Sequence, residues 1–334
     1  MRLDRDVLSI IIPAYNEERN IEKILGLLEK QTIEGFEVIV VDDGSTDNTP
    51  LLVSSYVPTK YSLVLLQQQN RGAAYAREIA INKSCSRFIA VIDCDDSIAN
   101  DTLEKAIKPL LNSKVIDISL FKLNYVNNVG GEILKVFTYY TKNKILDGRD
   151  VFNNCIRFWG VHAFGIYKRE RILHSYAIYH ELNRDKKNYL NNDEVISRIT
   201  FDISNRIIIT DADYFFVNNL QSTTRRINKN YFKVINNVFL LKRYIENKKE
   251  TRQSLHVMTD IQALSISTVW GVTVRYLKWR KFLNKTEQLQ WQELISTASI
   301  QLISAGKEHN ISISIKNKLQ LIIIRCLTRK WILC

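Results

Sequence analysis

The chain has 334 residues, 46% of them hydrophobic, which is enough apolar material for one large globular domain or for a domain with an appendage. Its formal net charge of +12 is unevenly distributed: residues 1–220 carry 27 basic and 29 acidic side chains, whereas residues 221–334 carry 20 and 6. These proportions exclude a disordered chain. They predict an anionic partner for the last third, either nucleic acid or an acidic membrane surface.

The cysteine pattern indicates the redox compartment of the protein. The cysteines are odd in number and scattered without a CxxC pair, at Cys85, Cys94, Cys155, Cys326 and Cys334. This argues against a disulfide framework and a structural zinc site, and it favours a reducing environment. The first residues, MRLDRDVLSIIIPAY, lack the apolar core of a secretion signal, and no stretch has the roughly 18 uncharged apolar residues of a membrane-spanning helix. We therefore expect a protein that is not secreted and does not cross a bilayer.

The first part of the chain alternates between strand and helix patterns. Strands are predicted at residues 8–15, 36–44, 61–69, 87–96 and 117–126, and helices at 17–31, 45–56, 72–84 and 100–113. Four repeats of strand and helix predict an α/β protein with a mostly parallel sheet flanked by helices.

Polar clusters follow four of these strands. They are Pro13–Glu17, Asp42 and Asp43, Asn70–Gly72, and Asp93–Asp96. Because ligands of such sheets bind beyond the carboxyl ends of the strands, clusters on one edge predict a site for a polar, phosphorylated ligand. Three acids within four positions are tolerated when a divalent cation neutralises them. The competing interpretation is a turn in which Asp96 or Ser97 caps the next helix.

From about residue 145 the alternation stops. A helix is predicted at 147–159, a strand or turn followed by a helix at 162–173, a short amphipathic helix at 191–205, and a returning strand at 206–219. Past residue 225 the pattern is helical and basic, so we place a domain boundary near residue 222.

Four segments carry a family resemblance. SIIIPAYNEERNI, VIVVDDGSTDNT, QNRGAAYARE and VIDCDDS, in this order and spacing, resemble the family 2 inverting glycosyltransferases of the bacterial surface-polysaccharide type, which have the GT-A fold. NNDEVISRITFDISNRIII and YFFVNNLQSTTR extend the resemblance over about residues 7–222. It implies a GT-A catalytic domain at 1–222, with a nucleotide-sugar half at about 1–126 and an acceptor half at about 127–222. A helical basic region at 223–334, with a possible membrane association, would follow.

The resemblance implies roles for the strand-end residues. Those that would bind the nucleotide are Pro13, Tyr15, Glu17, Asp42, Arg71 and Asp93. Within this set Asp42 would accept a hydrogen bond from a uracil edge and Asp93 would face the ribose. Asp95, the second acid of the Asp-x-Asp motif, would bind Mn²⁺ or Mg²⁺ on the diphosphate. Asp43 and Ser45 would shape the turn. UDP is the favoured nucleotide, with GDP and dTDP as alternatives.

The acidic motif near residue 193 would carry the chemistry. An inverting transfer needs one carboxylate that takes the proton of the acceptor hydroxyl as its oxygen attacks the anomeric carbon. The family has Glu-Asp at this site, whereas this sequence reads Asn192, Asp193, Glu194. Alignment of the apolar positions Val195 and Ile196 places Asp193 on the base, with Glu194 as the alternative. A helix N-cap role for Asp193 is compatible with catalysis.

Weaker candidates lie elsewhere. Trp159 and His162 are candidates for the acceptor pocket, and the alternatives are core packing for Trp159 and a packed or surface position for His162. His256 is a candidate C-terminal metal ligand. In the last predicted helix Lys318, Arg325 and Arg329 share one face and apolar residues cover most of the other. This pattern is typical of a helix in the membrane interface, and packing on the catalytic domain is the alternative.

Taken together, these features predict a metal-assisted glycosyltransferase that works with a nucleotide-sugar donor and a saccharide or lipid-linked saccharide acceptor, in surface polysaccharide or glycolipid assembly. We expect it in the cytoplasm, peripheral on the inner face of the cell membrane, with no nucleic-acid partner. The alternative class is a nucleic-acid-binding protein that uses the basic third, which leaves the strand-end motifs unexplained. A dinucleotide-dependent oxidoreductase is disfavoured because PAYNEE stands where a glycine-rich turn is needed.

Overall fold

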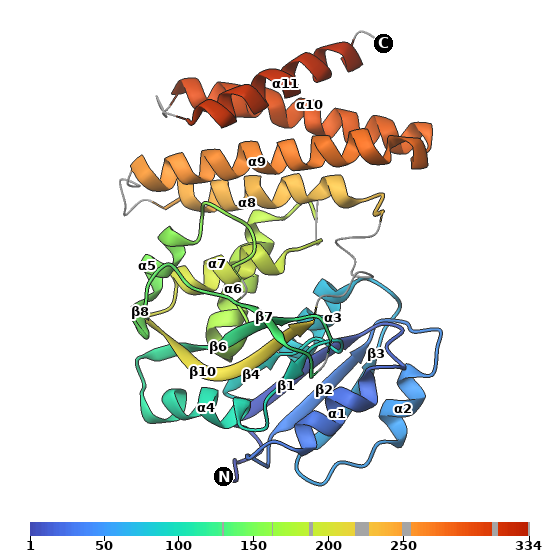
Figure 1. The fold of residues 1–334 in the computed structure, drawn as a ribbon, viewed down its shortest axis with the longest axis vertical. Coiled ribbons are helices and arrows are strands. Elements are labelled where there is room, and N and C mark those ends of the chain that lie inside the picture. The colour runs from blue at the N-terminus through green and yellow to red at the C-terminus, as the bar shows by residue number, and fades with distance from the viewer. Residues whose placement is uncertain are drawn as a thin grey trace. The chain divides into compact units, whose positions relative to one another are not determined.

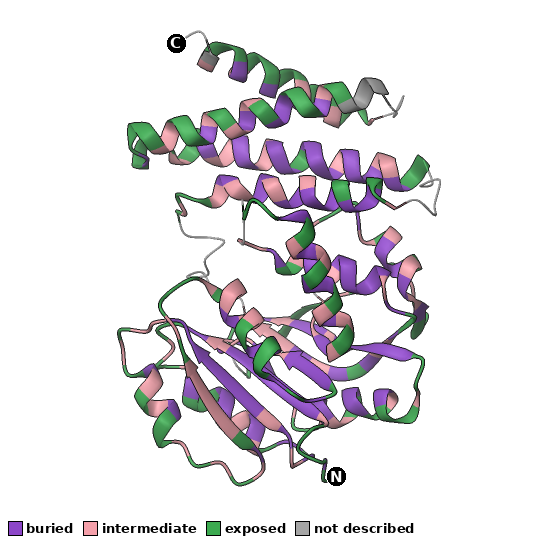
Figure 2. Cartoon of the chain, turned by 180° about the vertical axis from the view of Figure 1, so that it is seen from behind, coloured by how far each residue is buried: buried purple, intermediate pink, exposed green. Residues whose placement is uncertain are grey.

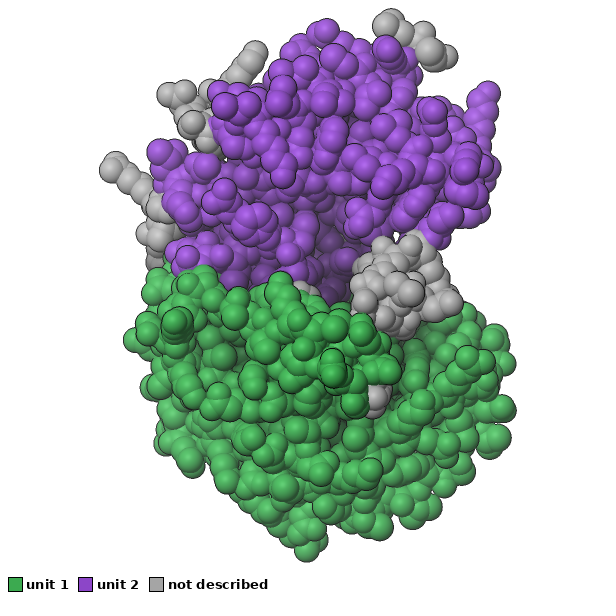
Figure 3. Space-filling view, viewed as in Figure 1, with its two compact units in different colours: residues 1–152, 162–177, 199–220 green, residues 153–161, 178–198, 221–334 purple. Residues whose placement is uncertain are grey.

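The structure is a computed structural model that describes residues 1–128, 130–161, 163–186, 190–217, 227–248, 255–308 and 313–332. The chain forms two compact units (Figure 3). Unit 1 comprises residues 1–152, 162–177 and 199–220, and unit 2 comprises residues 153–161, 178–198 and 221–334. The boundary expected near residue 222 lies outside the described residues, and two short segments that precede it belong to unit 2.

A mixed sheet forms the centre of unit 1. Its described part has ten strands in the order β3-β2-β1-β4-β9-β6-β10-β5, with β7 beside β6 and β8 beside β10 (Figure 1). The strands are β1 (Leu8–Ala14), β2 (Glu37–Asp42), β3 (Ser62–Gln67), β4 (Phe88–Val91), β5 (Ser97–Ile98), β6 (Ile116–Val126), β7 (Ile133–Val136), β8 (Ile145–Asp147), β9 (Gly165–Lys168) and β10 (Arg206–Val217). The helices up to residue 202 are α1 (Ile21–Glu29), α2 (Thr49–Ser55), α3 (Ala73–Lys83), α4 (Thr102–Asn112), α5 (Gly148–Asn154), α6 (Arg169–Leu182) and α7 (Asp193–Asp202).

The two faces of β1 are covered by different helices. Leu8, Ile10 and Ile12 join one buried cluster with apolar residues of α1 and α4. Ser9 points to the opposite face, since side chains alternate along a strand, and its hydroxyl contacts Ser84 at the end of α3 at 2.8 Å. A continuous apolar run covered on both faces is typical of a parallel strand.

The α/β fold class and the four strand–helix repeats are confirmed. Strands β1 to β4 pair in parallel, as the repeats predicted. Strand β9, however, lies antiparallel between β4 and β6, so the sheet is more mixed than expected. With four residues, β9 is too short to show a clear periodicity in the sequence.

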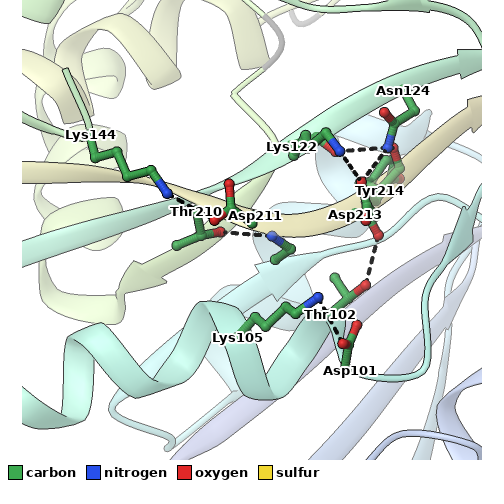
Figure 4. A network of polar contacts seen from close by, with 11 residues as sticks. Asp101, Thr102, Lys105, Lys122, Asn124, Lys144, Thr210, Asp211, Asp213 and Tyr214 are labelled. Carbon is green, nitrogen blue, oxygen red and sulfur yellow. Dashed lines mark hydrogen bonds and ion pairs between the residues drawn. The ribbon is translucent and has the colours of Figure 1, made fainter. Parts of the chain in front are cut away.

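A polar network anchors the end of β10. The register between β10 and β6 shifts just before Asp213. The Asp213 carboxylate pairs with Lys122 at 3.1 Å and accepts a hydrogen bond from Asn124 at 2.9 Å (Figure 4). Its carbonyl accepts a hydrogen bond from the Thr102 hydroxyl, at the start of α4, at 2.7 Å. The network fixes the next residue, Tyr214, which is fully buried.

The C-terminal part of unit 2 is a layered set of helices. They are η1 (Tyr231–Lys233), α8 (Val234–Glu246), α9 (Leu255–Trp279), η2 (Arg280–Phe282), α10 (Lys285–Glu308) and α11 (Ile315–Ile332). Helix α9 lies between α8 and α10, and α11 packs against α9 and α10 (Figure 1). Buried positions run along α8 and α9, whereas exposed positions dominate α11 (Figure 2). Trp291 is the largest fully buried side chain of their common core.

Helix α11 is partly packed and partly exposed. Gln320, Ile324 and Thr328 recur every four residues and are buried, and the Trp331 ring lies 5.1 Å from that of Tyr276. The predicted apolar face is therefore divided, because one side of it packs on unit 2 and the other stays exposed. In the described ranges, no helix has the length and apolar character needed to span a membrane.

Candidate functional site

The carboxyl ends of β1, β2 and β4 meet at one edge of the sheet. The parallel register puts Ala14 beside Asp42, and Ile11 beside Val91. The segments that follow the strands therefore lie together, and Cys94 donates from Sγ to the carbonyl of Pro13 at 3.4 Å. We call these segments, residues 13–17, 42–46, 68–72 and 92–96, the strand-end rim.

The turns after β1 and β2 are interlocked by polar side chains. Asn16 adopts a left-handed φ of 56°. Its N–H donates to Ser45 Oγ at 2.9 Å, and its side-chain oxygen accepts the N–H of Thr46 at 2.8 Å. This arrangement leaves Tyr15 47% exposed on the rim, where a flat ligand can contact its ring.

The two aspartates at the end of β2 have different partners. Both are buried. Asp43 accepts the N–H groups of Arg71 and Gly72 at 2.8 and 2.7 Å, which confirms its role in shaping a turn. Asp42 accepts the Ser45 N–H at 3.2 Å.

The turn after β3 exposes a cation. Gly72 precedes α3 with a φ of 91°, in the left-handed region that favours glycine. The Arg71 guanidinium lies 4.1 Å from the centre of the Tyr75 ring, and the side chain is exposed. An anionic ligand at the rim can therefore reach Arg71.

Two acids of the DCDD segment are held by protein groups. Asp93 pairs with Arg77 of α3 at 3.2 Å. Asp96 is buried and accepts hydrogen bonds from the Tyr214 hydroxyl at 2.7 Å and the Val217 N–H at 2.9 Å. The pKa of Asp96 is nevertheless well above its ordinary value, first because burial disfavours the charge and then because Asp93 is negative.

Glu17 adds a further carboxylate to this cluster. Its pKa is raised, first by burial and also by the negative charges of Asp95 and Asp93, although the hydrogen bond from Asn20 at 2.8 Å acts in the opposite direction. Four of the six carboxylates of the rim, Glu17, Asp93, Asp95 and Asp96, thus lie in one cluster, in which Arg77 forms an ion pair with Asp93. This surplus of negative charge favours a bound cation.

The donor set suits a hard divalent cation. Mg²⁺ is usually bound by one or two carboxylates and completed by waters and substrate phosphates. Within the ranges that the structure describes, no group of three or more His, Cys, Asp or Glu side chains could hold a metal ion alone. Burial raises the pKa of the Cys94 thiol, so a thiolate ligand is disfavoured. The residues present therefore fit a cation held jointly with a phosphate ligand.

A second acidic site lies at the start of α7 in unit 2. Asn191 has a left-handed φ of 54°, and the Asn192 carbonyl accepts the N–H groups of Val195 and Ile196 at 3.0 and 2.9 Å. The N-cap position is therefore Asn192, and Asp193 is the first helical residue. The N-cap role considered for Asp193 is thus wrong, and its side chain is exposed.

Both carboxylate oxygens of Glu194 accept hydrogen bonds from residues of unit 2. They accept the Gly160 N–H at 3.0 Å and an Arg198 N–H at 2.6 Å. Arg198 is fully buried and also donates to the carbonyl of Cys155 at 3.0 Å. The neighbouring acids therefore differ in exposure, because Asp193 is exposed and Glu194 is half-buried beside Arg198.

The candidates for the acceptor pocket and for a C-terminal metal ligand lie in unit 2 or outside the described residues. Trp159 donates from Nε1 to Thr268 Oγ1 at 2.8 Å and lines a pocket. His162 lies outside the described residues, as do the Ser/Thr positions of the QSTTR segment. His256 is exposed, with Nδ1 3.5 Å from a carboxylate oxygen of Asp260.

The structure brings the candidates together in two groups. The strand-end rim of unit 1 gathers Pro13, Tyr15, Glu17, Asp42, Arg71, Asp93 and Asp95, and unit 2 contains Trp159, Asp193 and Glu194. Sequence reasoning missed Arg77, Tyr214 and Arg198. Arg77 stands within the quoted NRGAAYARE segment, so its spacing from Gly72 on one helix was an available signal. Tyr214 acts through contacts between distant segments, for which the sequence gives no local signal. Arg198 stands four residues after Glu194 on one helix, so the spacing of this ion pair was an available signal, whereas its contact with Cys155 was not.

The fold is that of the GT-A glycosyltransferases. The structure of S. aureus TarS 1–349 in complex with UDP matches with a TM-score of 0.68 and 22% identity, over 96% of this chain and 87% of that one. The family described as Glycosyl transferase family 2 matches residues 9–169, a range that includes all four strand-end motifs. The chain therefore carries a family 2 glycosyltransferase domain.

Relatives of known activity match shorter segments of the chain. The UDP-Glc:alpha-D-GlcNAc-diphosphoundecaprenol beta-1,3-glucosyltransferase WfgD of Escherichia coli is 36% identical over 128 residues, 38% of this chain and 49% of WfgD. The poly(ribitol-phosphate) beta-N-acetylglucosaminyltransferase TarS of Staphylococcus aureus is 35% identical over 126 residues, 36% of this chain and 22% of TarS. The chain thus spans about half the length of WfgD and less of TarS. The mannosyltransferase PcManGT from Pyrobaculum calidifontis, solved with GDP-Man and Mn²⁺, matches over 97% of this chain and 87% of that one, with a TM-score of 0.50 and 16% identity.

Proposed function

We propose that the protein is an inverting glycosyltransferase that moves a sugar from a nucleotide diphosphate, with UDP favoured, to a hydroxyl group of a saccharide or lipid-linked saccharide. The observation that carries the proposal is the crowding of carboxylates at the strand-end rim, where burial first and the neighbouring negative charges next raise the pKa of Glu17 and Asp96. Such a rim suits the cation that accompanies a diphosphate. TarS structures of the same fold were solved with UDP and with UDP-GlcNAc, which supports this donor class.

The nucleotide is proposed to bind across the ends of β1, β2 and β3. The exposed ring of Tyr15 offers a surface for the base, with Pro13 and Glu17 beside it, and the buried carboxylate of Asp42 offers an acceptor for a uracil N–H. Arg71 adds an exposed cation. Asp93, held by Arg77 at 3.2 Å, is assigned to the ribose hydroxyls.

Asp95 is proposed to hold Mn²⁺ or Mg²⁺. It is half-buried between Asp93 and Asp96, in the cluster of carboxylates that includes Glu17. A cation bound here neutralises charge on the departing diphosphate. The Mn²⁺ in the PcManGT complex supports the assignment by likeness of fold.

Asp193 is proposed as the general base. Its carboxylate takes the proton of the acceptor hydroxyl while the hydroxyl oxygen forms a bond to the anomeric carbon. The bond from that carbon to the diphosphate breaks on the opposite face, and its electron pair leaves with the diphosphate. The exposed side chain of Asp193 supports this choice over Glu194, whose oxygens are engaged by Gly160 and Arg198.

We further propose that the outer face of α11 binds an acidic membrane surface, at the cytoplasmic face. Ile315, Leu319 and Ile322 on this face are 78%, 56% and 57% exposed, and Lys318 and Arg325 are exposed as well. An apolar stripe flanked by cations is typical of interfacial helices. The acceptor printed in the name of WfgD is lipid-linked, which supports work at a membrane. Sedimentation with phosphatidylglycerol vesicles, but not with phosphatidylcholine vesicles, is expected, and equal sedimentation with both or none would contradict it.

Calorimetric titration with UDP, GDP and dTDP, each with and without Mn²⁺, tests the donor site. We expect one diphosphate to bind selectively and more tightly with Mn²⁺. Absence of binding by all three would overturn the proposal and direct attention to the basic helices and to nucleic acid.

A further inference from the structure

Unit 2 contains a pocket to which the proposed function gives no ligand. Its volume is about 170 Å³, and a cavity of about 150 Å³ accommodates a six-membered aromatic ring. Trp159, the start of α7, and residues of α8 and α9 form its walls. The pocket therefore has room for one ring.

Arg275 supplies the positive charge of this pocket. It is half-buried, and its guanidinium lies 4.4 Å from the centre of the Tyr231 ring, which is also part of the wall. Among the described residues Arg275 has no carboxylate partner, whereas Arg198 of the same unit pairs with Glu194 at 2.6 Å. A partly desolvated guanidinium stacked on a ring gains from an anionic ligand, and its planar geometry matches phosphate.

Gly271 keeps the space beside this cation open. It lies one turn before Arg275 in the 25-residue helix α9, and a Cβ added there would be 3.7 Å from Arg275 Nη1. The guanidinium therefore lies close to the glycine. Glycine is unfavourable in a helix interior, and here the absence of a side chain leaves the pocket accessible.

The other walls suit a sugar ring. Trp159 and Tyr231 present aromatic surface, and Asn191 and Asn237 add side-chain amides. Asn237 Nδ2 donates to the carbonyls of Leu190 and Asn191 at 2.8 and 3.0 Å, which holds the turn before α7. The wall also includes Ser267, Thr268 and Glu194, whose carboxylate is paired with Arg198. Aromatic surface and polar groups are thus combined in one small-molecule-sized site.

We propose that this pocket binds a phosphate group of the acceptor, with Arg275 as the counter-ion, and that the sugar carrying the phosphate packs against the aromatic wall. The inference rests on the proposed function, because Asn191 and Glu194 of the pocket wall flank Asp193, the proposed base. An acceptor anchored here is held beside the turn that carries this base. The ligand class is therefore a phosphorylated saccharide.

Ligand-observed NMR with glucose 1-phosphate and with glucose tests the proposal on the full chain. Glucose 1-phosphate is expected to bind and glucose to bind much more weakly. Arg275→Gln should weaken glucose 1-phosphate binding by about tenfold or more, since a charged hydrogen bond is lost. The matched control is Arg280→Gln, which removes the same charge from an exposed position in η2 and should leave binding unchanged. Gly271→Leu fills the pocket while keeping Arg275, and it should also weaken binding.

Two further measurements separate the possible sources of binding. UDP with Mn²⁺ is added to the glucose 1-phosphate sample, because a phosphate bound at the strand-end rim would be displaced. Retained binding supports the pocket. Displacement by UDP, equal binding by Arg275→Gln and wild type, or no binding by wild type would overturn it. UDP binding is measured separately. If glucose 1-phosphate does not bind the pocket but UDP still binds, the donor proposal stands. If the wild type does not bind UDP, the result counts against the proposed function itself.

Discussion

The acids of the two units are compensated in different ways. At the strand-end rim Glu17 and Asp96 share one edge with Asp93 and Asp95, and the pKa of both Glu17 and Asp96 is raised. In unit 2 Glu194 meets the fully buried Arg198 at 2.6 Å. Carboxylates crowded against one another have uncompensated negative charge that a cation can neutralise. A carboxylate in an ion pair with a buried guanidinium is already neutralised and contributes to the folded structure. We therefore expect the crowded acids to bind a ligand and the paired acid to maintain the fold.

The largest effect is expected at the centre of the rim. Asp95→Asn should abolish the Mn²⁺-dependent part of UDP binding and lower transfer by about 10³ or more, since metal stabilisation of the leaving group amounts to several kcal/mol. Calorimetry and a transfer assay measure the two effects. The matched control is Asp101→Asn, which affects an exposed pair with Lys105 at 2.8 Å and should change neither. An unchanged response to Mn²⁺ in Asp95→Asn would remove Asp95 from the metal role.

Disruption of the ion pair between Arg198 and Glu194 is expected to destabilise the protein. Arg198→Met leaves Glu194 without its cation and should lower the free energy of unfolding by about 3–5 kcal/mol in a urea titration. Adding Glu194→Met to it should restore much of the loss, because no unpaired charge remains. Arg184→Met, which breaks an exposed pair with Glu181 at 3.3 Å, should cost less than about 1 kcal/mol. Similar losses for Arg198→Met and Arg184→Met would contradict the contrast between the units.

The crowded acids predict a pH dependence. The raised pKa of Glu17 means that the folded state binds this proton more tightly than the unfolded state does. The corresponding stability is present below the ordinary carboxyl range and is lost as the pH rises through the raised pKa. Glu17→Gln keeps an acceptor for Asn20 without the charge, so its stability relative to wild type should increase as the pH rises from about 4 to about 8. Urea titrations across this range measure the difference in the free energy of unfolding, and a constant difference would contradict the raised pKa of Glu17.

The smallest change in the free energy of unfolding is expected when one helical glycine in each unit is replaced by alanine. Gly271→Ala in α9 should raise the free energy of unfolding by up to about 1 kcal/mol, because alanine favours the helix and the added Cβ makes ordinary contact at 3.7 Å. Gly26→Ala in α1, where nothing lies within 4 Å, should give a similar gain. Thermal unfolding measures both. A loss of stability in Gly271→Ala alone would show that the pocket of unit 2 does not tolerate even a methyl group.

Much of the fold of unit 1 could be predicted because its signals are local. The apolar runs of β1, β2 and β3 are bounded by polar clusters, and the helices between them have a clear spacing. The antiparallel position of β9 has no such signal, since four residues carry no period. Helix α11 was ambiguous for another reason: its apolar residues lie on both a packed side and an exposed side, and composition alone does not tell them apart.

The site could be predicted where its residues follow strands directly. Asp42, Asp93 and Asp95 stand at the ends of predicted strands, so the sheet topology places them on one rim. Residues that contact the two acidic sites from distant segments could not be found in this way. Tyr214 reaches Asp96 across 118 residues of sequence, and Arg198 reaches Cys155 across 43. Such contacts depend on the packing of distant segments, which periodicity does not reveal.

The role of Asp193 as general base is tested by the transfer rate of Asp193→Asn, measured with the donor that calorimetry selects and compared with the variant's affinity for UDP and Mn²⁺. We expect nearly unchanged donor binding and transfer lowered by about 10² or more, because a general base is lost. Transfer at a near-normal rate would contradict the assignment and shift the base to Glu194.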